Sequence, residues 1–352
     1  MKTRGRAQWR NAVSRIAPLL PRERLHPGVV SWADQRPRGE RWAVALSGGS
    51  DSVALLLVLL AHWPERAGRL LALHFDHRLR GAESTADARF CRRLCAELGV
   101  AYVGARWESG SREKGEAGAR EARFAFIEGA MRARRTRVLW LGHQQDDVAE
   151  TMLMRLARGS GAAGLAAPRP VHAFEPERGR AGRRIHLRPL LALGKREIAK
   201  ALRGAGAPWR EDSSNAKGSH FRNRLRKSVV RGWVKASERD ALAGAALSRE
   251  LLEEDDRALE SWVDVTGCLG EDGSLWASKL LGRPKAVLRR ALHRWLLSRG
   301  KAGILSRQGF ESLLRSVERG TPVRHSLGRH GFAVIRGGCL RFESLRKSAV
   351  PH

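Results

Sequence analysis

Residues 46–52, which read LSGGSDS, are the segment of this chain whose residue types are best suited to chemistry. An apolar run at 42–45 comes directly before them, so we expect a buried strand, a tight loop and a helix that begins at Asp51 or Ser52. The glycines let a ligand approach the backbone, the serines supply hydroxyl groups, and the first amides of the helix carry the positive end of its dipole. The segment therefore predicts a phosphate-binding loop. It is not a Walker A loop, because no lysine follows its last glycine.

Three acidic side chains follow the predicted strand at 138–141: Asp146, Asp147 and Glu150. Asp146 and Glu150 are four residues apart, so on a helix they point the same way. The simpler explanation of acids at a helix N-terminus is that they only cap the helix. Beside a phosphate loop they can also hold Mg²⁺, attract a cationic amine or accept its proton. A flexible basic segment, RGSG, begins at Arg158 and suits a phosphate contact.

The predicted strand at 70–75 leads into a second polar group, HFDHRLR, at 74–80. Its histidines are not favoured as a metal site, because His74 and His77 face opposite sides of a strand. The group lies where an adenine or ribose could bind against the end of the sheet, which makes His77 a nucleotide-contact candidate. Arg80 could meet a phosphate.

Basic residues in two predicted helices are candidates for contacts with nucleic acid. On the helix at 115–134, Arg120 and Arg123 could lie near a nucleotide or RNA, although their spacing alone favours a surface ion pair and a basic face. Asn223 and Arg224 belong to a segment dense in arginine that follows a tryptophan, a composition that can stack a base and bind phosphates. Such runs are also often only solvated helix faces.

The charge of the chain favours a polyanionic partner. Its 352 residues include 66 Lys and Arg against 36 Asp and Glu, a net charge of +30. Each phosphate that the protein neutralises releases counterions, so binding should weaken steeply with salt. The composition of the coding DNA also contributes to the arginine excess, but nucleic acid remains favoured over a neutral small molecule alone.

Cysteine usage and hydropathy indicate a cytoplasmic protein. The four cysteines are too few for a disulfide framework, and no C-x-x-C pair exists to suggest a zinc or iron–sulfur site. No run of 18 apolar residues predicts a transmembrane helix, and the basic N-terminus lacks the apolar stretch of a signal peptide.

From residue 41 onward, strand and helix patterns alternate in the βαβ manner, which predicts an α/β fold with a doubly wound parallel sheet. Ligands of such folds bind at the carboxyl ends of the strands. The predicted strands lie at 41–46, 70–75, 100–107, 138–141 and 187–191. The predicted helices of this part lie at 51–62, 83–98, 115–134, 146–158 and 195–205.

We divide the chain into four regions by composition: a basic N-terminal extension (1–38), a catalytic domain (39–218), a helical linker or RNA-binding region (219–279) and a small C-terminal α+β domain (280–352). The pattern at 221–263 is helical and rich in charge. The last region shows helices at 285–298 and 306–319 and strand-like runs at 322–327 and 332–336.

Together these motifs resemble the tRNA(Ile)-lysidine synthase family of the PP-loop ATP pyrophosphatases, over about residues 40–230. The segments that carry the resemblance are SGGSDS, HFDHRLRGAES, EAGAREARF, GHQQDDVAETMLMRLARGSGAAGL, RPLL and PWREDSSN followed by RNRLR. The resemblance implies a PP-loop (adenine nucleotide α-hydrolase-like) sheet, followed by a helical region and a small C-terminal tRNA-binding domain.

The resemblance also implies a reaction, with ATP and Mg²⁺ as cofactors. The wobble cytidine of an isoleucine tRNA with a CAU anticodon is adenylated at its C2 oxygen, and free L-lysine then displaces AMP to give lysidine. The implied nucleotide contacts are Ser47, Gly48, Gly49, Ser50, Asp51, Ser52, His77 and Arg80. The implied catalytic residues are Asp51, Asp146, Asp147 and Glu150, with Asp51 and Asp147 for the metal. The implied tRNA contacts are Arg120, Arg123, Arg158, Asn223 and Arg224. We expect no membrane contact, and the sequence allows a homodimer.

Rival interpretations remain at this point. A cytidine thiolase of the same superfamily would need catalytic cysteines, commonly in C-x-x-C pairs, which the chain lacks. A nitrogen-transfer ligase would usually show an amidotransferase cysteine or lack the large positive charge. A non-catalytic RNA-binding relative would tolerate a decayed loop, whereas SGGSDS and the three acids are intact.

Overall fold

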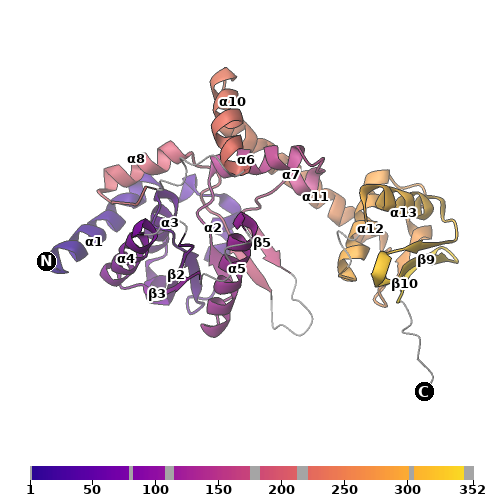
Figure 1. The fold of residues 1–352 in the computed structure, drawn as a ribbon, viewed down its shortest axis with the longest axis horizontal. Helices are drawn as coiled ribbons and strands as arrows, with labels where there is room; N and C mark the ends of the chain where they lie inside the picture. Colours follow the sequence, from indigo (N-terminus) through magenta and orange to yellow (C-terminus); the bar gives the residue numbers. More distant parts are fainter. Residues whose placement is uncertain are drawn as a thin grey trace. The chain divides into compact units, whose positions relative to one another are not determined.

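The computed structural model describes residues 2–78, 82–107, 115–174, 183–211, 221–300 and 305–344. The chain forms two compact units, Met1–Leu251 and Leu252–His352 (Figure 1). No helix in these described ranges is long and apolar enough to cross a membrane.

A six-stranded sheet forms the centre of the first unit, in the order β3-β2-β1-β4-β6-β5. All neighbours are parallel except β5, which runs antiparallel to β6 at one edge. The fold class is confirmed, with an unpredicted edge strand. The predicted strand at 187–191 lies earlier, since β6 ends at Leu187. The strands are β1 (Trp42–Ala45), β2 (Leu70–Asp76), β3 (Ala101–Arg106), β4 (Val138–Trp140), β5 (Val171–Phe174) and β6 (Arg184–Leu187).

Helices cover both faces of this sheet. Alternate strand residues point to opposite sides, and apolar residues on both sides need a helix to bury them. Val44 and Trp140 join a core cluster with residues of the helices at 2–19, 50–62, 82–98 and 195–205, whereas Ala43 and Leu139 join a cluster with residues of the helix at 115–133. The helices after β1 are α3 (Ser50–His62), α4 (Ala82–Leu98), α5 (Gly115–Ala133), α6 (Gln145–Leu156), α7 (Ala162–Leu165) and α8 (Lys195–Ala205), with a 3₁₀ turn, η2 (Pro64–Arg69).

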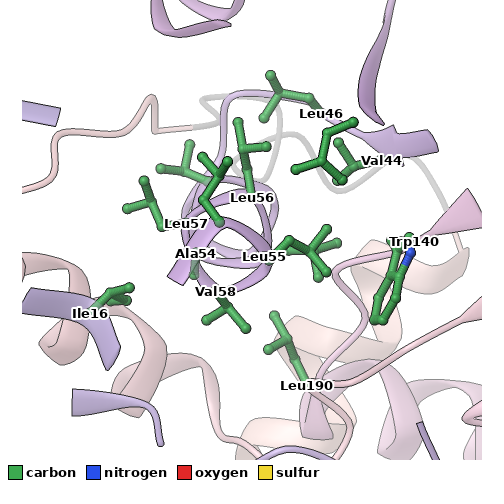
Figure 2. Packing of buried hydrophobic residues seen from close by; sticks show 14 of the residues in the cluster. Ile16, Val44, Leu46, Ala54, Leu55, Leu56, Leu57, Val58, Trp140 and Leu190 are labelled. Atoms are coloured by element: carbon green, nitrogen blue, oxygen red, sulfur yellow. The ribbon is translucent and has the colours of Figure 1, made fainter. Parts of the chain in front are cut away.

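Helix α3 is the most buried helix of this unit, and every residue from Ser52 to Leu60 is buried. Figure 2 shows its apolar side chains pointing outward in all directions, toward Ile16 on one side and toward Trp140 and Leu190 on another. A helix that is apolar all round must be enclosed by protein. The loop before α3 is therefore anchored on a rigid element.

The segment predicted as a basic extension packs into this same core. It contains α1 (Lys2–Leu19), η1 (Arg22–Arg24) and α2 (Pro27–Asp34). Trp9, Ala12, Ile16 and Leu20 are buried in the cluster around α3. The spacing of Trp9, Ala12 and Ile16 gives α1 one apolar face among its arginines, and Leu20 follows directly after the helix.

The helical region after α8 is interrupted rather than continuous. A π-helical segment lies between α9 and α10, and α11 begins after a break in which Asp240 Oδ1 accepts from the amides of Leu242 and Ala243 (3.1 and 3.0 Å). The elements are α9 (Phe221–Arg224), η5 (Leu225–Val230), α10 (Arg231–Ala236) and α11 (Ala241–Thr266). Helix α11 continues across the division between the units.

The second unit is an α+β domain, as expected for the C-terminal region. Its four-stranded antiparallel sheet has the order β7-β10-β9-β8. The core lies between this sheet and two helices, with Trp295 and Leu313 fully buried. The elements are β7 (Leu275–Trp276), η6 (Ala277–Leu280), α12 (Lys285–Ser298), α13 (Arg307–Arg319), β8 (Val323–Ser326), η7 (Gly328–His330), β9 (Phe332–Arg336) and β10 (Cys339–Glu343).

Candidate active site

The loop at 47–52 holds its shape through its own hydrogen bonds. The hydroxyl of Ser52 accepts from the amides of Ser47 and Gly48 (3.1 Å each) and donates to the carbonyl of Gly49 (3.0 Å). Gly48 has φ +92°, a left-handed conformation that other residues rarely adopt. The loop is therefore preorganised, and it leads directly into the N-terminus of α3, where anions are favoured.

A second glycine brings the end of β4 against this loop. A Cβ atom at Gly142 would lie 2.9 Å from the carbonyl oxygen of Asp51, closer than side chains normally approach a backbone. The sequence motif at 142–143 predicted no such contact. Because only residues 141–144 separate β4 from α6, this close approach places the acids of α6 beside the loop.

Gln144 fixes the start of α6 and the direction of its acids. Its side-chain oxygen accepts from the amide of Asp146 (2.7 Å), and Asp147 Oδ2 accepts from the amide of Gln144 (3.0 Å). The carboxyl of Asp146 also accepts from the backbone amide of Lys195, yet its pKa is raised, chiefly by burial. Asp146 Oδ2 is buried without a hydrogen-bond partner among the described residues. The negative charge of the Asp146 carboxylate is therefore only partly offset by hydrogen bonds.

Asp51 is the second poorly compensated carboxylate. Burial raises its pKa from 3.8 to about 6, although the hydroxyl of Ser50 donates to Oδ1 at 3.0 Å. The negative charges of Asp147 and Asp146 raise the pKa further, and the ammonium of Lys195 lowers it. The edge of the sheet therefore holds more buried negative charge than its neighbours neutralise.

Two arginines that sequence analysis missed hold the remaining acids. Arg222 donates to Asp147 Oδ1 and Glu150 Oε2, each at 2.6 Å, and Arg226 donates to both oxygens of Glu150. Glu150 is fully buried. The spacing of four between Arg222 and Arg226 could have indicated a paired basic face, but only the fold shows which acids they meet.

A cavity of about 500 Å³ opens over the loop and these acids. It is lined by Ser47, Gly49, Ser50, Asp51, Ser52, Asp87, Gln144, Asp147, Lys195, Ala199, Arg203, Trp209, Arg210, Glu211 and Arg226. Arg210 joins its walls, since the side chain donates to Asp87 at 2.8 Å and the amide donates to Gly48 O at 2.9 Å. The predicted loop residues other than Gly48 thus share one space with Asp147, while Asp146 and Glu150 lie outside its lining.

The family model for the PP-loop domain matches residues 29–232, more than half of the chain. The chain belongs to the PP-loop family.

Curated relatives support a more specific likeness. The chain is 36% identical over 289 residues to a tRNA(Ile)-lysidine synthase of Geobacter sulfurreducens, covering 78% of this chain and 58% of that one. It is 34% identical over 266 residues to the Bacillus subtilis protein of that name (72% and 54%) and 42% identical over 193 residues to that of Solibacter usitatus (54% and 40%). The chain spans about half the length of the curated relatives it matches.

Among solved structures, the U34-tRNA thiolase NcsA from Methanococcus maripaludis aligns with a TM-score of 0.49 at 16% identity, covering 69% of this chain and 78% of that one. A likeness of this size supports no conclusion about chemistry.

None of the other predicted contacts whose side chains are described lines the PP-loop cavity. His77 packs against Phe75 and Trp107 rings, at 4.8 and 6.4 Å between centroids. The guanidinium of Arg123 lies over Phe124. Asn223 and the exposed Arg224 lie on α9, and Arg158 is exposed just after α6. Arg80 lies outside the described residues, as does the side chain of Arg120.

The PP-loop carboxylates fit Mg²⁺ bound together with phosphate. Among the described residues, no group of three His, Cys, Asp or Glu side chains forms a metal site by itself. Mg²⁺ usually takes one or two carboxylates and completes its shell with phosphate oxygens and water. Asp51 and Asp147 both line the cavity and could supply those ligands. A cation there would also relieve the charge that raises the pKa of Asp51.

Proposed function

We propose that this chain ligates lysine to C2 of the wobble cytidine in an isoleucine tRNA with a CAU anticodon, using ATP. One observation carries the proposal: the PP-loop, Asp51 and Asp147 line a single cavity. The likeness to proteins named tRNA(Ile)-lysidine synthase supplies the substrates.

In the first half-reaction, the C2 oxygen of the cytidine attacks the α-phosphorus of ATP and pyrophosphate leaves. The preorganised amides and hydroxyls at 47–52 would stabilise the developing charge on the phosphates. Asp51 and Asp147 would hold Mg²⁺, which supplies positive charge to the polyphosphate. Adenylation turns the C2 oxygen into a good leaving group.

In the second half-reaction, the ε-amine of lysine attacks C2 and AMP leaves with the former C2 oxygen. The amine must first lose a proton. Asp146, next to the cavity-lining Asp147, is suited to accept it, because burial raises its pKa. Asp147, which lines the cavity, would help attract the ammonium group.

The tRNA would be held mainly by positive charge. The net charge of +30 favours binding to phosphates, and Arg158 and Arg224 are exposed. We place this reaction in the cytoplasm, where tRNA and ATP are available. Assembly as a homodimer stays a prediction.

A thiolase is not favoured by the cysteines of this chain. All four are buried. Burial raises the pKa of Cys95 to about 12 and raises that of Cys91 as well, which opposes the thiolate that sulfur chemistry requires.

The test is mass analysis of tRNA nucleosides after incubation of the full chain with ATP, isotope-labelled lysine and an unmodified isoleucine tRNA. We expect cytidine at the wobble position to be replaced by a nucleoside carrying the label. The same tRNA with uridine at that position is the matched control and should stay unlabelled. Unchanged cytidine, or a nucleoside that has gained sulfur, would contradict the proposal.

A further inference from the structure

Helix α8 presents a cationic face to the cavity. Lys195, Ala199 and Arg203 all line it, and they are four residues apart, so they share one side of the helix. The adjacent side, with Ile198 and Leu202, is fully buried in the core cluster around α3. An ion pair between Arg24 and Glu197 adds a contact with the N-terminal segment. The two cations therefore project from a fixed element rather than from a loop.

The PP-loop itself offers no cationic side chain. Residues 47–52 contain only glycine, serine and Asp51. A Walker A loop carries a lysine that reaches the outer phosphates, and the present loop lacks it. A polyphosphate bound at this loop would need positive charge from another part of the cavity.

Four cationic residues line the cavity, and they fall into two classes. Arg210 is paired with Asp87, and Arg226 is paired with Glu150. The described part of the chain offers the side chains of Lys195 and Arg203 neither a hydrogen bond nor an ion pair. Two of the four cations are thus occupied by protein carboxylates, and two are available to an anionic ligand.

The positions of the two available cations match an elongated anion. Lys195 lines the same cavity as Ser50 and Asp51 of the PP-loop. Arg203 lies eight residues after Lys195, which is about 12 Å further along the axis of α8. Ala199 between them carries only a methyl group and leaves room over this face.

We propose that Lys195 and Arg203 form a second anion-binding element of this site and hold the polyphosphate of ATP against the PP-loop. Lys195 contacts the phosphates nearest the loop and replaces the missing Walker lysine, and Arg203 contacts the terminal phosphate. Both stabilise pyrophosphate as it leaves. The inference rests on the proposed use of ATP and adds two residues to that site.

A carboxylate is the other anion that these cations could hold, because free lysine carries one. The two ligands share the same chemistry, so the experiment measures them separately. Isothermal titration with magnesium pyrophosphate and with α,β-methylene ATP reports on the polyphosphate. Steady-state ligation with lysine as the varied substrate reports on the carboxylate.

The variants are Lys195→Ala and Arg203→Ala, with Lys195→Arg as the charge-conserving replacement. Lys200→Ala is the matched control, because Lys200 is an exposed cation of α8 that does not line the cavity. Thermal unfolding checks that each variant is folded, which we expect because Lys195 and Arg203 are exposed.

We expect each alanine variant to weaken the binding of pyrophosphate and of the ATP analogue by about ten- to a hundredfold, the size of a lost charged hydrogen bond. Lys195→Arg should recover most of the affinity, and Lys200→Ala should match the wild type. Wild-type affinity in both alanine variants would overturn the inference, and so would a loss confined to the KM for lysine.

The inference and the proposed function fail in different ways. A wild-type protein that binds ATP through Lys195 and Arg203 but yields no lysidine would contradict the proposed function and leave the polyphosphate element standing. A wild-type protein that binds neither pyrophosphate nor the ATP analogue would overturn both.

Discussion

Each unit of this protein contains a region where arginines hold several carboxylates on neighbouring helices. In the first unit, Asp147 and Glu150 are held by Arg222 and Arg226. In the second unit, Arg290 holds Asp256, whose side chain is 3% exposed. Arg290 and Arg294 also bind two further acids, Glu260 and Asp264. Both regions fix helices to one another through ion pairs.

The difference lies in the acids that remain. In the second unit, Glu260 and Asp264 are 37% and 63% exposed, so water solvates their charge. In the first unit, Asp51 and Asp146 have raised pKa values because of burial, and the described residues provide no ion-pair partner for either. A buried ion pair by itself indicates only structure. Buried charge without a partner, beside a cavity, indicates a binding site for a cation.

Removing Asp51 should have the largest effect on activity. We expect Asp51→Ala to lower tRNA-dependent ATP–pyrophosphate exchange by at least about a hundredfold, because the charge that positions the reacting phosphates is lost. Binding of tRNA should change little. Asp264→Ala, which removes an exposed acid of the second region, is the control and should keep full exchange. Full exchange in Asp51→Ala would remove the PP-loop acid from the mechanism.

Removing an acid that is paired with arginine should lower stability in both units but lower activity only in the first unit. Glu150→Ala removes a buried carboxylate from Arg222 and Arg226, and Asp256→Ala removes one from Arg290, which we expect to cost about 2–3 kcal/mol of unfolding free energy. Denaturant titration measures this cost. At temperatures where both variants stay folded, ligation should fall only in Glu150→Ala. An equal fall in Asp256→Ala would mean that the two regions do not differ in role.

The raised pKa of Asp51 makes stability depend on pH. The folded state binds this proton up to about pH 6, whereas a free carboxyl loses it near 3.8. The folded state therefore loses stability as the pH rises from about 4 to about 6, by about 3 kcal/mol. In Mg²⁺-free buffer, Asp51→Asn should melt at a higher temperature than the wild type at pH 7 and at the same temperature below pH 4. Equal melting temperatures at pH 7 would contradict a buried, uncompensated charge.

The smallest effect should come from an exposed arginine of α9. Arg224 lies between Arg222 and Arg226 but is exposed. If it contacts a tRNA phosphate, Arg224→Ala should reduce the slope of log K against log salt by about 0.7–0.9. Filter binding at several salt concentrations measures this slope. Arg132→Ala on α5, also an exposed arginine, should leave it unchanged. An unchanged slope in Arg224→Ala would make its segment structural.

The sequence predicted those elements whose signals are local. Residues 285–298 form α12 as predicted, and the helix after the PP-loop begins one residue early, at Ser50. β5 was missed because it is a short, partly exposed edge strand. The packing of α1 was missed because its many arginines obscure a single apolar face.

The site could be predicted only as far as its motifs extend. The loop and the acids of α6 follow from residue types and spacing. The partners of those acids do not, since Arg222 is 72 residues from Glu150 and only the fold joins them. The same holds for Asp87 and Arg210, which are 123 residues apart. Which acids have an arginine partner and which do not can therefore be read only from the structure.

A structure of the protein with Mg²⁺ and a non-hydrolysable ATP analogue tests the central claim most directly. We predict phosphates held by the amides at 47–52 and a metal ion that joins them to the carboxylate of Asp51. A nucleotide whose phosphates lie away from this loop, with Asp51 and Asp146 still unpaired and no metal between them, would contradict the account.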